Sequence, residues 1–292
     1  MDAVITYVNG LDPQWRESYY ETLGVRTNEK RYRDWGTLKY LLRGIETNMP
    51  FIRNVYLVVS SESQVPEWAS DELKIVLHKD IIPERFLPTF NSSVIELFLQ
   101  RIDGMDEEFV YFNDDMFPIL PCRPKDFFIN GKAAMNFRPC LFYPGQYKKQ
   151  TRNSYRMACK ASGIKPGLVF YRQQHTATTM FRSVNEKVFR QMESEILPGI
   201  SPLRTDYNIN QTFYLDYMKV NGLTVNSPLK KKHFSLATMA VGKRLMNFFA
   251  NPDCQMICVN DCNVSKKKFD STSSAFLKAM ENRFSRKSRF EK

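Results

Sequence analysis

Several features are scarce or absent in this chain of 292 residues. No run of about 18 apolar residues occurs, which excludes a helix that spans a bilayer. No internal repeat and no low-complexity linker is present, which excludes a repeat array. No signal peptide opens the chain, because Met1-Asp2 leads directly into a predicted strand. We therefore expect a cytoplasmic protein whose thiols stay reduced.

Cysteine and histidine are residue types that can bind metal ions, so their positions need an interpretation. Cys254, Cys258 and Cys262 are spaced by four residues, which is not a usual zinc spacing. On a strand that spacing puts them on one face, and we expect them to pack in the core. Only three histidines occur. His78 lies at the end of a predicted strand and is expected to be a loop residue, with a ligand role as the alternative.

The charge of the chain is distributed unevenly. Hydrophobic residues make up 43% and charged residues 25%, as in ordinary soluble globular proteins. Residues 1–121 contain 12 basic and 20 acidic side chains, a net charge of −8, whereas residues 122–292 contain 30 and 11, a net charge of +19. The first part can hold metal ions, and the second can hold phosphates, an anionic polymer or an anionic membrane surface. The alternative is that the basic side chains are ordinary solvated surface.

Apolar segments and amphipathic helical patterns alternate through residues 1–117. Predicted strands lie at residues 4–8, 54–59, 74–78 and 109–112. Asp34 is a plausible N-cap of one intervening helix, and Asn91 or Ser92 of another. This alternation predicts βαβ units, and hence an α/β protein with a Rossmann-like, mainly parallel sheet flanked by helices. We expect one catalytic domain with a βαβ half over residues 1–128, an irregular, basic insertion or lid over residues 129–170, and a basic half with a C-terminal helical segment over residues 171–292.

The stretch Asn113-Asp114-Asp115 directly follows the most apolar predicted strand. Ligands in open α/β sheets collect beyond the carboxyl ends of the strands, and adjacent carboxylates there suit a divalent cation that also binds phosphate. Asn260-Asp261 repeats the pattern after a second apolar segment. The alternative for both is a turn, because Asn and Asp favour turns.

Three residues of the basic half are candidates for chemistry. His175 has the side chain best suited to act as a general base near neutral pH, although a lone histidine is more often structural. Arg204 precedes a predicted helix and can bind phosphate through its planar fork. Asp206 is a second candidate there, with a helix cap as its alternative. At the start of the chain, a strand, the turn Asn9-Gly10 and a predicted helix resemble the opening of many nucleotide-binding folds.

Four stretches together resemble the Stealth protein family, which includes bacterial capsular polysaccharide phosphotransferases and the catalytic subunit of N-acetylglucosamine-1-phosphotransferase. They are residues 2–15, residues 31–128, the stretch from His175 through Arg182-Ser183-Val184 to Asp206, and Cys258-Val259-Asn260-Asp261 with the terminal Arg283-Phe284 and Ser288-Arg289-Phe290-Glu291. Two departures stand out. Asn9 replaces an aspartate that the family usually has. Pro202 occupies the family's usual arginine position, and Arg204 lies two residues before Asp206.

The resemblance implies transfer of a sugar 1-phosphate from a nucleotide-sugar, with UDP-hexose favoured, to a hydroxyl of a polysaccharide or glycan acceptor. It implies Mg²⁺ or Mn²⁺ held by Asp114, Asp115, Asn260 and Asp261. It implies catalytic roles for His175, Arg204, Asp206 and Asp115. The implied nucleotide-sugar-binding residues are Thr6, Asn9, Gly10, Arg31, Arg33, Asp34, Asn91 and Asn113.

Two other functions compete with this reading. A metal-dependent glycosyltransferase with a type-A nucleotide-sugar fold would share the acidic cluster but would break the sugar C1–O bond. A non-catalytic module that binds polyanions would use only residues 122–292, which have a net charge of +19. No nucleic-acid partner is expected. The basic tail and the apolar stripe of Phe276, Leu277, Met280 and Phe284 predict peripheral contact with the inner face of a bacterial membrane.

Overall fold

The predicted alternation of strands and helices forms a five-stranded sheet in the computed structural model, which describes residues 1–27, 31–142, 144–236, 243–260 and 265–292. The strand order is β10-β4-β1-β2-β3. Strands β4, β1, β2 and β3 are parallel, and β10 is antiparallel to β4. The bounds are β1 Asp2–Thr6, β2 Val55–Val59, β3 Leu73–Leu77, β4 Glu108–Asn113 and β10 Thr178–Phe181. The expected α/β fold with a mainly parallel sheet is confirmed.

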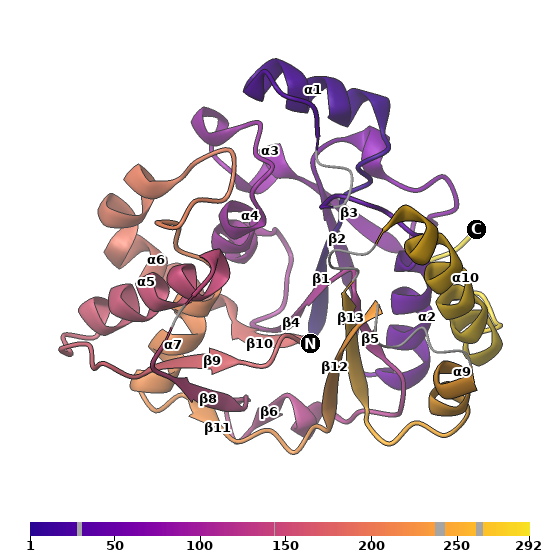
Figure 1. Cartoon of the computed structure of the whole chain (residues 1–292). Helices are drawn as coiled ribbons and strands as arrows, with labels where there is room; N and C mark the ends of the chain where they lie inside the picture. The colour runs from indigo at the N-terminus through magenta and orange to yellow at the C-terminus, as the bar shows by residue number, and fades with distance from the viewer. Residues whose placement is uncertain (28–30, 143, 237–242, 261–264) are drawn as a thin grey trace.

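Helices cover both faces of this sheet. In Figure 1, α2, α9 and α10 lie to the right of the central strands, and α4, α5, α6 and α7 lie to the left. Strands β2 and β4 are buried along their apolar residues, as expected for a sheet covered on both sides. The helix bounds are α1 Pro13–Leu23, α2 Leu38–Asn48, α3 His78–Ile81, α4 Ser92–Phe98, α5 Gln146–Ala161, α6 Arg182–Ile196, α7 Thr212–Val220, α9 Lys243–Ala250 and α10 Lys266–Arg283.

The described residues also form three smaller sheets. Strand β13 (Met256–Asn260) lies between β12 (Lys231–Ser235), to which it is parallel, and β5 (Met116–Pro118), to which it is antiparallel. Because β5 follows β4 after a two-residue turn, the end of β13 is carried to the carboxyl edge of the central sheet. The other strands are β6 Phe128–Ile129, β7 Lys132–Ala134, β8 Phe137–Cys140, β9 Phe170–Gln173 and β11 Thr224–Val225.

Two helix starts test the capping predictions. Asn91 accepts a hydrogen bond from the Ser93 amide and caps α4, as expected. The Asp34 prediction is wrong: α2 begins at Leu38 and Thr37 precedes it. The Asp34 carboxylate instead accepts a hydrogen bond from the Tyr7 hydroxyl at 2.8 Å. Gly36, with a positive φ of 77°, turns the chain between Asp34 and the helix.

The C-terminal segment packs against the core. Phe276, Met280 and Phe284 are buried, so this part of the apolar stripe is covered by protein. Phe276 contacts the ring of Phe117. The buried guanidinium of Arg43 pairs with Glu291 at 2.8 Å and ties the end of the chain to α2. None of the described helices is long and apolar enough to cross a membrane.

Candidate active site at the carboxyl edge of the central sheet

Asp114 and Asp115 are the two residues of the turn that joins β4 to β5. The turn interpretation of this stretch is therefore confirmed. It does not compete with a functional role, because both side chains line cavities at the sheet edge. The turn is held in place by neighbouring elements. Thr37 donates a hydrogen bond to the carbonyl of Asp114, and the amide of Val259 donates to the carbonyl of Asp115 at 2.9 Å.

The hydroxyl of Tyr111 links the ends of the two central strands. It is fully buried on β4 and lies 2.9 Å from Oγ1 of Thr6, at the end of β1. It donates a hydrogen bond to Oδ1 of Asn113 at 2.7 Å. That bond orients the Asn113 amide, and its Nδ2 lies 3.5 Å from Nε2 of His175. Burial holds the pKa of Tyr111 well above its usual range, so the hydroxyl remains a donor.

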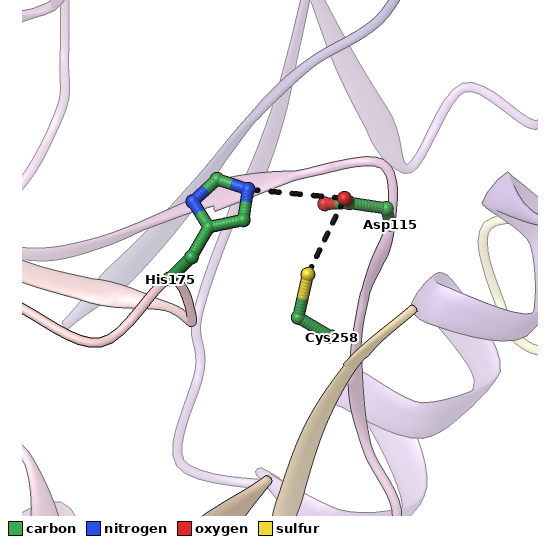
Figure 2. A group of neighbouring side chains, drawn as sticks. All are labelled: Asp115, His175 and Cys258. Atoms are coloured by element: carbon green, nitrogen blue, oxygen red, sulfur yellow. Dashed lines mark hydrogen bonds and ion pairs between the residues drawn. The ribbon is translucent and has the colours of Figure 1, made fainter. Parts of the chain in front are cut away.

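A carboxylate, an imidazole and a thiol converge beside this network (Figure 2). Nε2 of His175 lies 3.8 Å from Oδ2 of Asp115, and Sγ of Cys258 donates to the same oxygen at 3.3 Å. His175 comes from the loop between β9 and β10, and Cys258 from β13. Three separate parts of the chain therefore meet at one carboxylate.

The electrostatic environment of His175 favours its charged form. Burial by itself lowers the pKa of the imidazole, but the hydrogen bond and the charge of Asp115 and the charge of Glu96 outweigh it. The pKa of His175 therefore lies above its ordinary value. Glu96 is itself buried, and burial raises its pKa even though Arg204 opposes the effect. The Glu96 carboxylate accepts a hydrogen bond from the Gln211 amide at 3.2 Å.

The donor atoms at this edge fit a divalent metal ion. One ligand atom each from Asp115, His175 and Cys258 lie within 4.8 Å of one another, so the three side chains can hold a metal. Oδ1 of Asp115 is buried and has no hydrogen-bond partner among the described residues, which is costly without a ligand. Asp114, Asp115 and Asn260 line one cavity and form a second, oxygen-rich donor set. Asp261, the fourth predicted ligand, lies outside the described residues.

Four of the eight predicted donor-binding residues, Thr6, Asn113, Arg31 and Arg33, line two adjoining cavities. Thr6, Asn113, Asp114, Asp115 and Arg204 line one of about 180 Å³. Its wall also includes the rings of Trp15, Tyr32 and Phe90, which form an aromatic cluster with Tyr19. A second cavity, of about 160 Å³, contains the two carboxylates with Arg31 and Arg33. Carboxylates, arginines and aromatic rings thus lie around one edge of the sheet.

Asn91 positions Arg204 rather than lining a cavity. Its side chain is fully buried, and its amide nitrogen donates to the carbonyls of Ser201 and Leu203 at 3.1 and 3.2 Å. These bonds fix the loop that precedes α7. The guanidinium of Arg204 then donates to the hydroxyl of Ser92, beside the cavity. The arginine therefore reaches the site although it does not occupy the family's usual position.

Four other predicted residues lie away from the two carboxylates. Asn9 accepts from the Leu11 amide, and Gly10 lies so close to Tyr32 that a side chain would overlap its backbone. Asp34 contacts Tyr7, which lines the first cavity. Asp206 pairs with Lys149 at 2.5 Å on the surface. It does not cap a helix, because Gln211 precedes α7.

Sequence reasoning did not select Glu96, Tyr111 or Cys258 as site residues. Cys258 is buried, as predicted, yet its thiol contacts Asp115. Its place beside Asn260 in the fourth matching stretch was the available signal. Glu96 and Tyr111 gave no such signal, because Glu96 is a single carboxylate within a helix and Tyr111 lies inside an apolar strand. Only the fold shows what each side chain faces.

Comparison with known proteins yields relatives of one kind. The family model "Stealth protein CR2, conserved region 2" matches residues 31–136. Exopolysaccharide phosphotransferase cps2G of Lactiplantibacillus plantarum is 28% identical over 100% of this chain and 96% of its own length. Capsular polysaccharide phosphotransferase WcwK of Streptococcus pneumoniae is 27% identical over 100% of this chain and 99% of its own. The chain is therefore similar to polysaccharide phosphotransferases over its whole length, and residues 31–136 match conserved region 2 of the Stealth proteins.

Two further matches were found. Exopolysaccharide phosphotransferase SCO6023 of Streptomyces coelicolor is 32% identical over 89% of this chain and 47% of its own length, so this chain spans about half of that relative. Among solved structures, the galactosyltransferase LgtC in complex with donor and acceptor sugar analogues gives a TM-score of 0.45 at 10% identity, over 97% of this chain and 96% of that one.

Proposed function

We propose that this chain is a phosphotransferase of surface polysaccharide synthesis that moves a hexose 1-phosphate from a nucleotide-sugar to an acceptor hydroxyl. The relatives named as capsular and exopolysaccharide phosphotransferases support the reaction class. The observation that carries the proposal is the His175–Asp115 pair, because Asp115 also lines a cavity that contains Arg204. A base, a carboxylate and a phosphate-binding cation are the groups that such a transfer needs.

In this reaction the acceptor oxygen attacks the β-phosphorus of the donor. A new P–O bond forms, the bond from the β-phosphorus to the oxygen it shares with the α-phosphorus breaks, and a nucleoside monophosphate leaves. Asp115 faces Nε2 of His175, which fixes the ring and leaves Nδ1 as the nitrogen that accepts the proton of the acceptor hydroxyl. Arg204 neutralises the oxygens of the transferring group, and Arg31 and Arg33 contribute from the adjoining cavity.

Mg²⁺ or Mn²⁺ fits the oxygen-rich donor set of Asp114, Asp115 and Asn260, with Asp261 as a fourth ligand. Such an ion, when bound, neutralises the charge of the diphosphate. The contacts divide Asp115 between two tasks: Oδ2 meets His175 and Cys258, and Oδ1 is left for a cation. A set that includes imidazole and thiolate would instead favour a softer metal such as zinc.

The aromatic cluster supports a nucleotide-sugar as the donor. Trp15, Tyr32 and Phe90 provide a stacking wall for a base or sugar, and Thr6 and Asn113 provide polar atoms at the end of the cavity. Asn9, Gly10, Asp34 and Asn91 act here by holding this wall and its loops. We favour UDP-hexose as the donor and a glycan hydroxyl as the acceptor, and we keep Asp206 as a proposed catalytic residue although its carboxylate pairs with Lys149 on the surface.

We also propose the division into residues 1–128, 129–170 and 171–292, as a donor half, a lid and a basic half of one catalytic domain. A cytoplasmic location, with contact to an anionic membrane surface, fits a polymer made at the inner face of a membrane. With most of the apolar stripe of α10 buried, that contact would rest on basic side chains.

The released nucleotide tests the reaction type. Incubation with UDP-hexose, a glycan acceptor and Mg²⁺ should release uridine monophosphate as product is formed. A type-A glycosyltransferase would instead release the diphosphate. No nucleotide release with any donor in the presence of Mg²⁺ or Mn²⁺ would favour the polyanion-binding alternative.

A further inference from the structure

A separate cavity with a strongly basic lining lies on the other side of the His175–Asp115 pair. It has a volume of about 410 Å³, within the range of pockets that bind small molecules. Its polar lining includes Arg138, Lys148, Arg172, Gln173, His175 and His233. No aspartate or glutamate is among the described residues that line it, in contrast to the donor cavities, which contain Asp114 and Asp115.

The cations of this cavity are brought together at a cost. Arg138 on β8 and Arg172 on β9 are directly opposite each other in an antiparallel pair, a position where like charges destabilise a sheet. Neither arginine, nor Lys148 on α5, forms an ion pair with any residue that the structure describes. Strand β8 and helix α5 of the predicted lid, together with the neighbouring strand β9, therefore direct positive charge to one place without a counter-ion among the described residues.

A buried amide gives a second, independent indication of a ligand. The Gln173 side chain is only 6% exposed, and neither its nitrogen nor its oxygen has a hydrogen-bond partner among the described residues. Leaving both ends of a buried amide unpaired is costly. The hydroxyl groups of a bound molecule would satisfy both ends of the amide, and an anion would satisfy its nitrogen. Polar donors and unpaired cations next to each other are the features of an anion site.

The position of the cavity indicates which substrate would enter it. His175 lines this cavity, whereas its partner Asp115 lines the donor cavities, so the proposed base stands between the two spaces. If the nucleotide-sugar binds on the Asp115 side, the basic cavity remains free for the acceptor. The acceptor is the molecule whose hydroxyl group loses its proton to His175. The ring of His233 lies 6.1 Å from that of His175 and lines the same cavity.

We propose that this basic cavity is the acceptor site, and that the acceptor carries an anionic group, a phosphate or a carboxylate, close to its reacting hydroxyl. The anion lies between Arg138 and Arg172 with Lys148 beside it. The assignment to the acceptor rests on the proposed transfer reaction, whereas the anion site itself does not.

Binding can be measured without any turnover. The chain has only three histidines, so the imidazole signals of His78, His175 and His233 can be resolved by NMR after ¹³C-histidine labelling. At constant ionic strength, glucose 6-phosphate should shift the His175 and His233 signals in a saturable way, and glucose should not. His78 lines a donor cavity and should not respond. Glucuronic acid distinguishes the sources: a response to one anion alone identifies phosphate or carboxylate, and a response to both identifies the shared charge.

Variants test the arginines. Arg138→Gln and Arg172→Gln should each weaken glucose 6-phosphate binding by about tenfold or more, as for the loss of a charged hydrogen bond. Arg138→Lys should retain part of the affinity, and Lys165→Gln, which removes an exposed cation elsewhere, should retain all of it. The glutamine variants should melt no lower than the wild type, because they relieve a like-charge pair.

Three results would overturn the anion site: equal responses to glucose and glucose 6-phosphate, a response centred on His78, or unchanged affinity in the Arg172→Gln variant. Uridine monophosphate release, measured separately, tests the transfer reaction. Anion binding without release of uridine monophosphate would support the anion site and contradict the proposed transfer reaction. If uridine monophosphate is released equally fast with neutral and anionic acceptors, only the assignment of this cavity to the acceptor is contradicted.

Discussion

Nε2 of His175 lies 3.8 Å from Oδ2 of Asp115, although helix α5 and several short strands separate the two residues in the sequence. The turn after β4 supplies the carboxylate, and the loop between β9 and β10 supplies the imidazole. The thiol of Cys258 also donates a hydrogen bond to Asp115. The carboxylate of Asp115, from the acidic half of the chain, therefore contacts two residues of the basic half.

If His175 and Asp115 act as a unit, their substitutions will not be additive. His175→Gln and Asp115→Asn should each lower kcat by about 10²-fold to 10⁴-fold, the usual contribution of general acid–base catalysis. The double variant should be hardly slower than the worse single variant. Asp103→Asn, which removes an exposed carboxylate before β4, is the control and should keep its activity. Multiplicative losses in the double variant would show that the two residues act independently.

Metal dependence separates the two donor sets. We expect chelation to abolish nucleoside monophosphate release and Mg²⁺ or Mn²⁺ to restore it. Asp114→Asn should raise the metal activation constant by at least about tenfold, whereas Cys258→Ser should change it less, because thiols are poor ligands for hard cations. Zinc as the better activator, together with a large effect of Cys258→Ser, would assign the metal to Asp115, His175 and Cys258 instead.

His78 makes stability depend on pH. Burial lowers the pKa of this histidine to about 4, from 6.5 in the unfolded chain. As the pH falls, the unfolded state therefore binds the proton at a higher pH than the folded state does. The contribution of His78 to the unfolding free energy is fully present above pH 6.5 and is lost as the pH drops towards 4. Over this window the wild type should lose about 3 kcal/mol more unfolding free energy than His78→Gln, as measured by urea denaturation. Parallel pH profiles of the two proteins would contradict the prediction.

The C-terminal segment should contribute to stability through Arg43. Its guanidinium and the carboxylate of Glu291 are both almost fully buried, with side-chain exposures of 7% and 5%. Arg43→Leu leaves that carboxylate unpaired and should cost about 3–5 kcal/mol in urea unfolding. The exposed pair of Arg190 and Glu186 is the matched control, and Arg190→Leu should cost under about 1 kcal/mol. Similar losses in the two variants would mean that burial does not strengthen the Arg43 contact.

The sequence predicted those parts of the site that depend on local pattern. The strand before Asn113-Asp114-Asp115 was correctly placed because its apolar residues are contiguous. The cap at Asn91 was predicted because it needs only the next two residues. The cap at Asp34 was wrongly predicted, since its carboxylate is used by Tyr7, a residue of a different element.

Long-range contacts were beyond such patterns. Nothing local indicates that Asn91 also holds the Arg204 loop, or that the thiol of Cys258 meets Asp115. The family resemblance brought His175, Arg204 and Asp115 into one site before the fold was known, and the structure places them around one edge of the sheet. The opposed pair Arg138 and Arg172 was visible only in the register of β8 and β9.

The central claim is that phosphorus travels with the sugar. It is tested most directly by ³¹P NMR of the product made from a UDP-hexose labelled with ¹³C at C1. We predict a phosphodiester signal coupled to the labelled carbon, with one equivalent of uridine monophosphate released for each linkage. Labelled sugar joined to the acceptor without phosphorus, with release of uridine diphosphate, would contradict the account.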